Sequence, residues 1–221
     1  KDLGLEEVRN FKFIDHPDDN QLNAAMNELK RLGALDNEEN ITDKGRTMAS
    51  LPMEPRLSNL IIEANSNGVV DTVTTMAAFL ELKPVILMMN VDDIYKKLYD
   101  ELIIEKTDAE GNIAEINSSE QENLERKSQH EFERYQGVVA NLQDARSDFF
   151  TLLHIYDLWI RNSKSEDWAN ANFLNNGTLL EAENVKAELL DIAKAHQMSN
   201  EDTVSGQDLI AKVDKTLVSA F

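Results

Sequence analysis

Residues 13–57 constrain the fold more than any other stretch, because they open with an amphipathic helix whose start and end are both marked. Its apolar residues recur at the i, i+3, i+4, i+7 and i+10 spacing of one buried helix face; they are Leu22, Ala25, Met26, Leu29 and Leu32. The break at Pro17 and the polar residues 18–20 mark its start, and Gly33 marks its end. The spacing therefore predicts a buried helix between Pro17 and Gly33.

A tight β-ribbon and a second helix are predicted directly after that helix. The polar turn 36–40 is followed by Ile41, which is the pattern of two short strands joined by a loop. Thr42 is placed to cap a second helix, which Pro52 and Pro55 terminate. Helix, short ribbon and helix, in this order, predict a winged helix.

The chain from residue 69 onward has the apolar periodicity of helices almost throughout. One stripe repeats with helical spacing at Val91, Ile94, Tyr95, Leu98, Tyr99, Leu102 and Ile103. After a turn at 108–112, the Ser119 to Glu122 capping box opens a second striped helix, so the two helices are expected to fold back on each other. Another capping box at Thr178 opens a further helix, and 205–221 form the last one. The predicted fold class is mostly α.

Composition narrows the classes of function. The chain has 41 acidic and 22 basic residues and a formal charge of −19, which repels nucleic acid at long range, so the isolated chain is expected to bind RNA poorly. Its lack of cysteine excludes disulfides and thiolate metal sites. No run of about 18 apolar residues occurs and no signal peptide is recognisable, which predicts a cytoplasmic protein with no membrane partner.

No catalytic or metal site can be argued from spacing. The histidines share no metal-ligand spacing; they are His16, His130, His154 and His196. The sequence contains no phosphate loop, no Asp-Glu-Ala-His box and no arginine-finger motif, so nothing here could bind and polarise ATP. Catalytic residues, metal ligands and cofactors are all predicted to be absent from this chain.

The motifs of the first 57 residues resemble the junction of winged helix and helicase-associated domain in DEAH-box helicases. The resemblance is carried by three strings, which stand here as Leu32-Gly33-Ala34-Leu35, Ile41-Thr42-Asp43-Lys44-Gly45-Arg46-Thr47-Met48-Ala49 and Pro52-Met53-Glu54-Pro55-Arg56-Leu57. Each string is weak alone, but their joint order and spacing are specific. Further segments extend the resemblance towards the C-terminus, at 61–64, 68, 71–80, 147–159, 168, 172–174 and 215–221. Phe149 is closer to bacterial members than the histidine more usual there.

The resemblance implies a division into a winged helix at 1–66, with an N-terminal linker from a missing motor, and a helical, ratchet-like domain at 67–221. It also implies that the chain is part of a longer ATP-dependent RNA helicase, whose RecA-like motor binds ATP and Mg and whose β-barrel follows in cis. In that setting the helical domain forms part of the channel for single-stranded RNA, and the chain alone is inactive. The alternative is a docking adaptor or winged-helix regulator without helicase activity.

Candidate nucleic-acid contacts fall into two sets. The basic set is Lys44, Arg46 and Arg56, near the free N–H groups of the helix that begins after Thr42. For Arg46 and Arg56 the favoured alternative is that they hold the winged helix against the helical domain by pairing with carboxylates. The polar set follows from the implied channel wall, which grips by backbone and polar contacts; it comprises Thr72, Thr74, Thr75, Ser147 and Asp148.

Residues 91–134 depart from the family pattern, because about 65 residues separate the helix ending near Leu80 from the Ser147-Asp148 motif. The favoured interpretation is a solvated helical hairpin inserted into the bundle. The alternative is an arm that docks a protein partner. Acidic residues outnumber basic ones in this segment, which argues against a direct nucleic-acid role.

Overall fold

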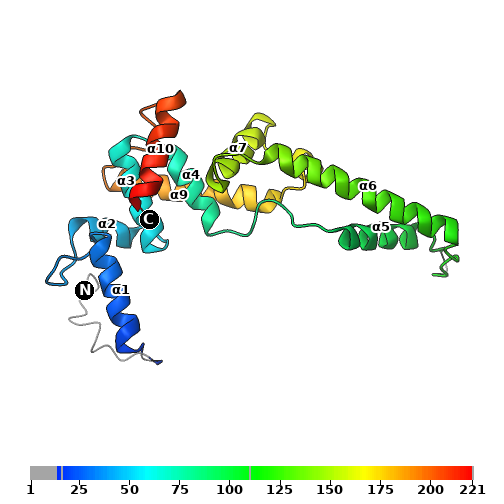
Figure 1. Cartoon of the computed structure of the whole chain (residues 1–221), viewed down its shortest axis with the longest axis horizontal. Coiled ribbons are helices and arrows are strands. Elements are labelled where there is room, and N and C mark those ends of the chain that lie inside the picture. Colours follow the sequence, from blue (N-terminus) through cyan, green and yellow to red (C-terminus); the bar gives the residue numbers. More distant parts are fainter. Residues whose placement is uncertain (1–13, 16, 110, 221) are drawn as a thin grey trace. The chain divides into compact units, whose positions relative to one another are not determined.

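Helices dominate the computed structural model, which describes residues 14–15, 17–109 and 111–220. Within that part of the chain, the residues group into a first unit, up to residue 82 and from 180 onward, and a second unit, 83–179 (Figure 1). Phe13, His16 and Phe221 lie outside the described residues. The predicted mostly α fold is confirmed, and among the described helices none is long and apolar enough to span a bilayer.

The first helix of the winged helix begins and ends as predicted. α1 (Asp19–Arg31) is capped by Asp18, whose carboxylate accepts the N–H of Gln21 at 2.7 Å while the Gln21 side chain accepts the N–H of Asp18 at 3.1 Å. This reciprocal pair satisfies two backbone donors that a helix start leaves unpaired. Gly33 follows the helix at φ +75°, a left-handed conformation that glycine adopts without strain.

The β-ribbon takes its shortest form. It consists of one antiparallel bridge between Leu35 and Ile41, flanked by a hydrogen bond from the N–H of Thr42 to the carbonyl of Ala34 at 3.0 Å. The loop closes when Asp36 accepts both the backbone N–H and the side-chain amide of Asn40, at 2.7 and 3.1 Å. α2 (Asp43–Ser50) starts directly after it, with Thr42 as the predicted cap.

The first unit is built on a helical core. Against α3 (Pro55–Asn67) pack α2, α4 (Val70–Leu80) and α10 (Gly206–Ala220). α9 (Asn176–Ala195) belongs to this unit from Leu180 onward. One core cluster joins Leu51, Ile61, Ala77 and Leu189. Pro55 opens α3 instead of only ending α2, since a proline at the first helical position loses no hydrogen bond.

The second unit contains the predicted hairpin. α5 (Val91–Glu105) and α6 (Ser118–Leu142) lie side by side and antiparallel (Figure 1). The unit continues through α7 (Asp148–Arg161) and α8 (Glu166–Ala171). The largest fully buried side chain among its described residues is Trp159, whose indole N–H donates to Asn176 at 3.1 Å.

Two predicted helix caps are wrong by a few residues. The hairpin's second helix is capped by Asn117, which forms a capping box with Glu120, so Ser119 and Glu122 lie inside the helix. α9 begins at Asn176, and the side chain of Asn175 accepts the N–H of Thr178 at 3.2 Å. Thr178 therefore lies within the first turn instead of capping it.

Candidate nucleic-acid interface

The basic residues predicted in the winged helix are largely engaged by carboxylates. Lys44 donates to Glu63 at 2.7 Å and so joins α2 to α3. Arg56 pairs with Glu28, and this hydrogen bond lowers the pKa of the Glu28 carboxyl and raises that of the Arg56 guanidinium. The carboxylate partner of Arg56 therefore lies on α1, within residues 1–66. Arg46 is exposed on α2, and its backbone N–H donates to Thr42.

The Thr-x-x-Gly string that carries much of the resemblance has a structural role. The Thr42 hydroxyl donates to the carbonyl of Gly33 at 2.6 Å and accepts the N–H of Gly45 at 2.9 Å. A Cβ on Gly45 would lie 2.1 Å from the carbonyl oxygen of Ala34, so only glycine allows α2 to approach the ribbon this closely. These motif residues fix the fold of the winged helix and leave ligand contact to other side chains.

Thr72 is tied to a distant part of the first unit. Its hydroxyl donates to the Asp202 carboxylate at 2.5 Å, and its backbone N–H lies 3.3 Å from both oxygens of the same carboxylate. Asp202 thereby satisfies donors at the start of α4, where backbone N–H groups lack helical partners. Beside it, Lys186 of α9 pairs with Asp71 at 2.8 Å. The Thr72 hydroxyl is therefore already occupied.

Thr74 and Thr75 are closed to solvent. The side chain of Thr75 is 3% exposed and its hydroxyl donates to the carbonyl of Asp71 at 2.8 Å. Thr74 is 0% exposed, and its hydroxyl has no hydrogen-bond partner among the residues that the structure describes. The structure argues against direct ligand contact through either hydroxyl, because α4 would have to open first. The threonine-rich pattern reflects helix packing here.

Ser147 and Asp148 lie at the start of α7 in the second unit. Ser147 is the N-cap residue, its carbonyl accepts the N–H of Thr151 at 3.1 Å, and its hydroxyl has no partner within the described part of the chain. Asp148 is exposed in the first turn. The Ser147 hydroxyl is buried, so of this pair only the Asp148 side chain is exposed.

Arg146, which sequence reasoning missed, completes this helix start. Its guanidinium lies 3.9 Å from the centre of the Phe150 ring and donates to Asp144 at 2.8 and 2.6 Å. These hydrogen bonds from Arg146 hold the pKa of Asp144 far below its usual range. The available signal was a basic residue directly before the Ser-Asp motif. Arg146, Ser147 and Asp148 together form the candidate interface of the second unit, which we call the α7 start.

The predicted contacts therefore divide between the two units. The first unit holds Lys44, Arg46, Arg56 and the three threonines, and the second holds Ser147 and Asp148. Across the residues described, no group of three or more histidine, aspartate or glutamate side chains could hold a metal ion. The arrangement offers hydrogen bonds and charge to a ligand, and we identify no acid, base or nucleophile assembled for catalysis.

Comparisons with known proteins match most of this chain to helicase-associated sequences. Residues 25–53 match the family described as the winged-helix part of the helicase associated domain (HA2), and residues 54–152 match its ratchet-like part. The pre-mRNA-splicing factor ATP-dependent RNA helicase prp22 of Schizosaccharomyces pombe is 28% identical over 190 residues. That alignment covers 86% of this chain and 13% of the relative, so the chain spans a small part of the protein it matches.

Proposed function

Because this chain belongs to the helicase-associated region of the DEAH-box helicases, we propose that it is an accessory region of an ATP-dependent RNA helicase. In this role it forms part of the channel for single-stranded nucleic acid and couples that channel to RecA-like motor domains. ATP and Mg bind to the motor, and the isolated chain hydrolyses no ATP. The observation that carries the proposal is the pair of consecutive family matches over residues 25–152.

The α7 start is the surface we assign to the strand. A helix start offers backbone N–H groups to a phosphate, and the exposed Arg146, which also pairs with Asp144, adds positive charge. Asp148 opposes an anion, so we expect contact with sugar hydroxyls and base edges as well as with phosphate. The winged helix then serves as a rigid connection between domains, because Lys44 and Arg56 form ion pairs within the first unit.

Several finer predictions stay predictions. They concern the division of the chain after residue 66, the status of 91–134 as an insertion, the bacterial type of the parent helicase and its cytoplasmic location. The two family matches meet between residues 53 and 54. A reading frame that continues upstream into a phosphate loop and downstream into a β-barrel would support the parent helicase. An adaptor or regulator would have neither.

Site-specific crosslinking in the complete parent protein tests the proposed channel. A photoreactive residue at position 148, at the start of α7, is expected to crosslink to a single-stranded RNA. The same group at position 161, exposed on the last residue of α7, is the matched control and should not crosslink. Equal labelling at both positions, or none at 148 while the protein unwinds RNA, would refute the channel assignment.

A further inference from the structure

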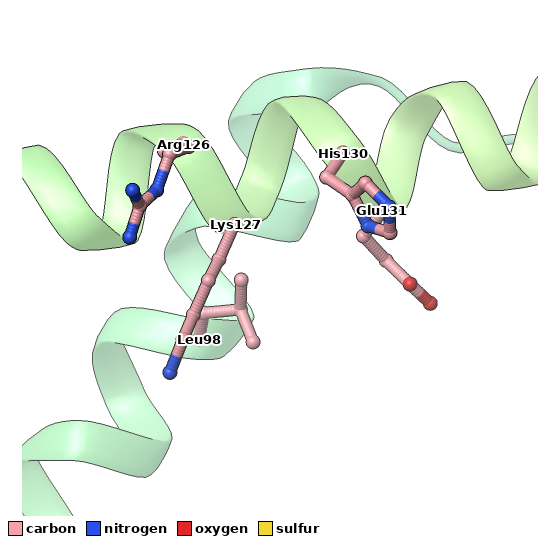
Figure 2. A pocket seen from close by; sticks show the side chains of 5 residues that line it. All are labelled: Leu98, Arg126, Lys127, His130 and Glu131. Atoms are coloured by element: carbon pink, nitrogen blue, oxygen red, sulfur yellow. The ribbon is translucent and has the colours of Figure 1, made fainter.

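A groove on the α5–α6 hairpin is lined mainly by basic side chains, although the chain as a whole is strongly acidic. It has a volume of about 400 Å³ and is lined by Leu98 of α5 and by four residues of α6, which are Arg126, Lys127, His130 and Glu131. Figure 2 shows Lys127 extending from α6 past Leu98, with His130 and Glu131 one turn along the same helix. The groove lies entirely within the second unit, and its basic side chains are exposed.

The charges in this groove are not neutralised by ion pairs. The Arg126 guanidinium donates to the neutral amide oxygen of Asn123 at 3.1 Å, and within the described residues Lys127 has no carboxylate in ion-pair range. Elsewhere, basic side chains are typically paired, as in Lys44 with Glu63 and Lys106 with Glu120. Unpaired cations this close together give a local positive potential despite the net charge of −19.

The one acid that lines the groove is already occupied. Glu131 accepts hydrogen bonds from Arg134 at 3.0 and 2.7 Å, and these bonds are the main reason that its pKa is lowered. The basic residues that line the groove all come from α6, and α5 contributes Leu98.

The spacing of these groups suits an extended anionic chain. Arg126 and His130 lie four residues apart along α6, so they succeed one another at about 6 Å on one side of the helix. Positively charged grooves that follow the backbone are one of the two means by which proteins bind single strands without sequence preference.

We propose that this groove binds the backbone of single-stranded nucleic acid, with Arg126, Lys127 and His130 on phosphates and Leu98 as an apolar floor. The inference rests on the proposed function for the choice of nucleic acid over another polyanion. It revises the sequence-based expectation for 91–134, because the acidic balance of the whole segment conceals a local cationic face. Besides Glu131 in the lining, Glu122 lies four residues before Arg126 and Glu133 three residues after His130, and these acids limit the affinity of that face.

Titration of the 221-residue chain with fluorescent U20 RNA at 25 mM salt tests the groove. R126E/K127E is expected to raise the Kd about tenfold and to reduce the slope of log K against log salt by about 1.4, since each single-strand phosphate contact contributes about 0.7. K194E/K215E is the matched control, because it changes the net charge equally at exposed lysines of the first unit. An equal loss of RNA affinity in both variants would refute the proposed binding groove.

A second variant keeps the test independent of folding. E122Q/E133Q removes the two flanking acids and is expected to lower the Kd several-fold, a gain that misfolding cannot produce. If E122Q/E133Q and R126E/K127E both bind U20 with an unchanged Kd, the proposal for the groove is refuted. It is also refuted if polyglutamate displaces the labelled RNA as effectively as unlabelled U20 does. If position 148 of the parent protein still crosslinks to RNA while R126E/K127E binds U20 as tightly as the unchanged chain, only the proposal for the groove is refuted. If that labelling is absent, the proposed channel fails.

Discussion

The α2–α3 region and the α5–α6 hairpin are both helix pairs, yet they are held together in different ways. α3 buries Leu60 and Ile61 completely and packs against α2, α4 and α10. Along the 25 residues of α6, only Leu124, Ser128 and Leu142 are buried. Burial of apolar side chains stabilises the first region, and the motif residues allow its helices to pack closely. The hairpin depends more on caps and ion pairs, and this leaves its surface available for a ligand.

The largest effect should come from truncating the core of α3. Ile61→Ala is expected to lower the free energy of unfolding by about 3 to 4 kcal/mol, because the side chain is 0% exposed and its removal leaves a cavity. In the hairpin, Ile104→Ala should change it by about 0.5 kcal/mol or less, since that side chain is 74% exposed. Urea unfolding followed by circular dichroism measures both. Similar losses would remove the contrast between the two regions.

Two glycines should respond with opposite signs. Gly45→Ala is expected to destabilise the winged helix by about 3 kcal/mol, because the new Cβ would meet the Ala34 carbonyl at 2.1 Å and backbone cannot give way cheaply. Gly137→Ala in α6 should stabilise the hairpin by about 0.8 kcal/mol, as nothing lies within 4 Å and alanine favours a helix. Hydrogen exchange of the α2 and α6 peptides would resolve each change locally, and two changes of the same sign would contradict the assignment.

The two regions close their loops with the same chemistry, which gives a finer test. Asp36 with Asn40 and Asp108 with Asn112 form matching side-chain pairs, and both loops contain a left-handed residue, Glu39 at φ +67° and Gly111 at φ +85°. Gly111→Ala should cost about 1 kcal/mol, because alanine is strained in that conformation. Glu39→Gly removes such strain but also loses the pair with Lys30 at 3.1 Å, so its net change should stay within about 0.5 kcal/mol. Chemical unfolding of the two variants measures the difference.

Short-range signals predicted the elements of both regions, but they did not always predict the caps. Around the start of α6, Asn117 with Glu120 and Ser119 with Glu122 are equally good capping boxes by pattern. The structure selects the first, in which Glu120 also accepts a hydrogen bond from Lys106 at 2.7 Å across the hairpin. The choice depends on a residue of the other helix, and local spacing carries no information about it.

The candidate contacts show the same limit at longer range. Thr72, Thr74 and Thr75 are alike in sequence, but Thr72 is engaged by Asp202, 130 residues away, and the other two are buried. The α7 start was predictable in part, because Ser147 and Asp148 belong to a recognisable motif. The cationic groove was not, since Leu98 meets the basic residues of α6 only when the hairpin folds. Residue types indicate what a site could do, and tertiary packing decides which side chains remain available.

The smallest effect, a pH dependence, would show whether ion pairs hold the hairpin. The hydrogen bond from Lys106, followed by that from the Asn117 backbone, lowers the folded-state pKa of Glu120. A carboxylate with a lowered folded pKa contributes stability above its unfolded pKa of about 4.3, and this stability is lost as the pH falls through the folded value. Protection of the amides in residues 118–124, corrected for intrinsic exchange, should therefore decline between pH 6 and pH 3.

Glu120→Gln is the matched control for this decline. Glutamine still accepts the N–H of Asn117 in the capping box, but it has no charge to lose, so the protection of 118–124 should become nearly independent of pH. The α3 peptide around Ile61, which is held by apolar burial, should keep its protection over the same range. A decline that persists in Glu120→Gln, or one equally large around Ile61, would mean that acid acts on the whole chain. The hairpin would then be no more dependent on its ion pairs than the α3 core.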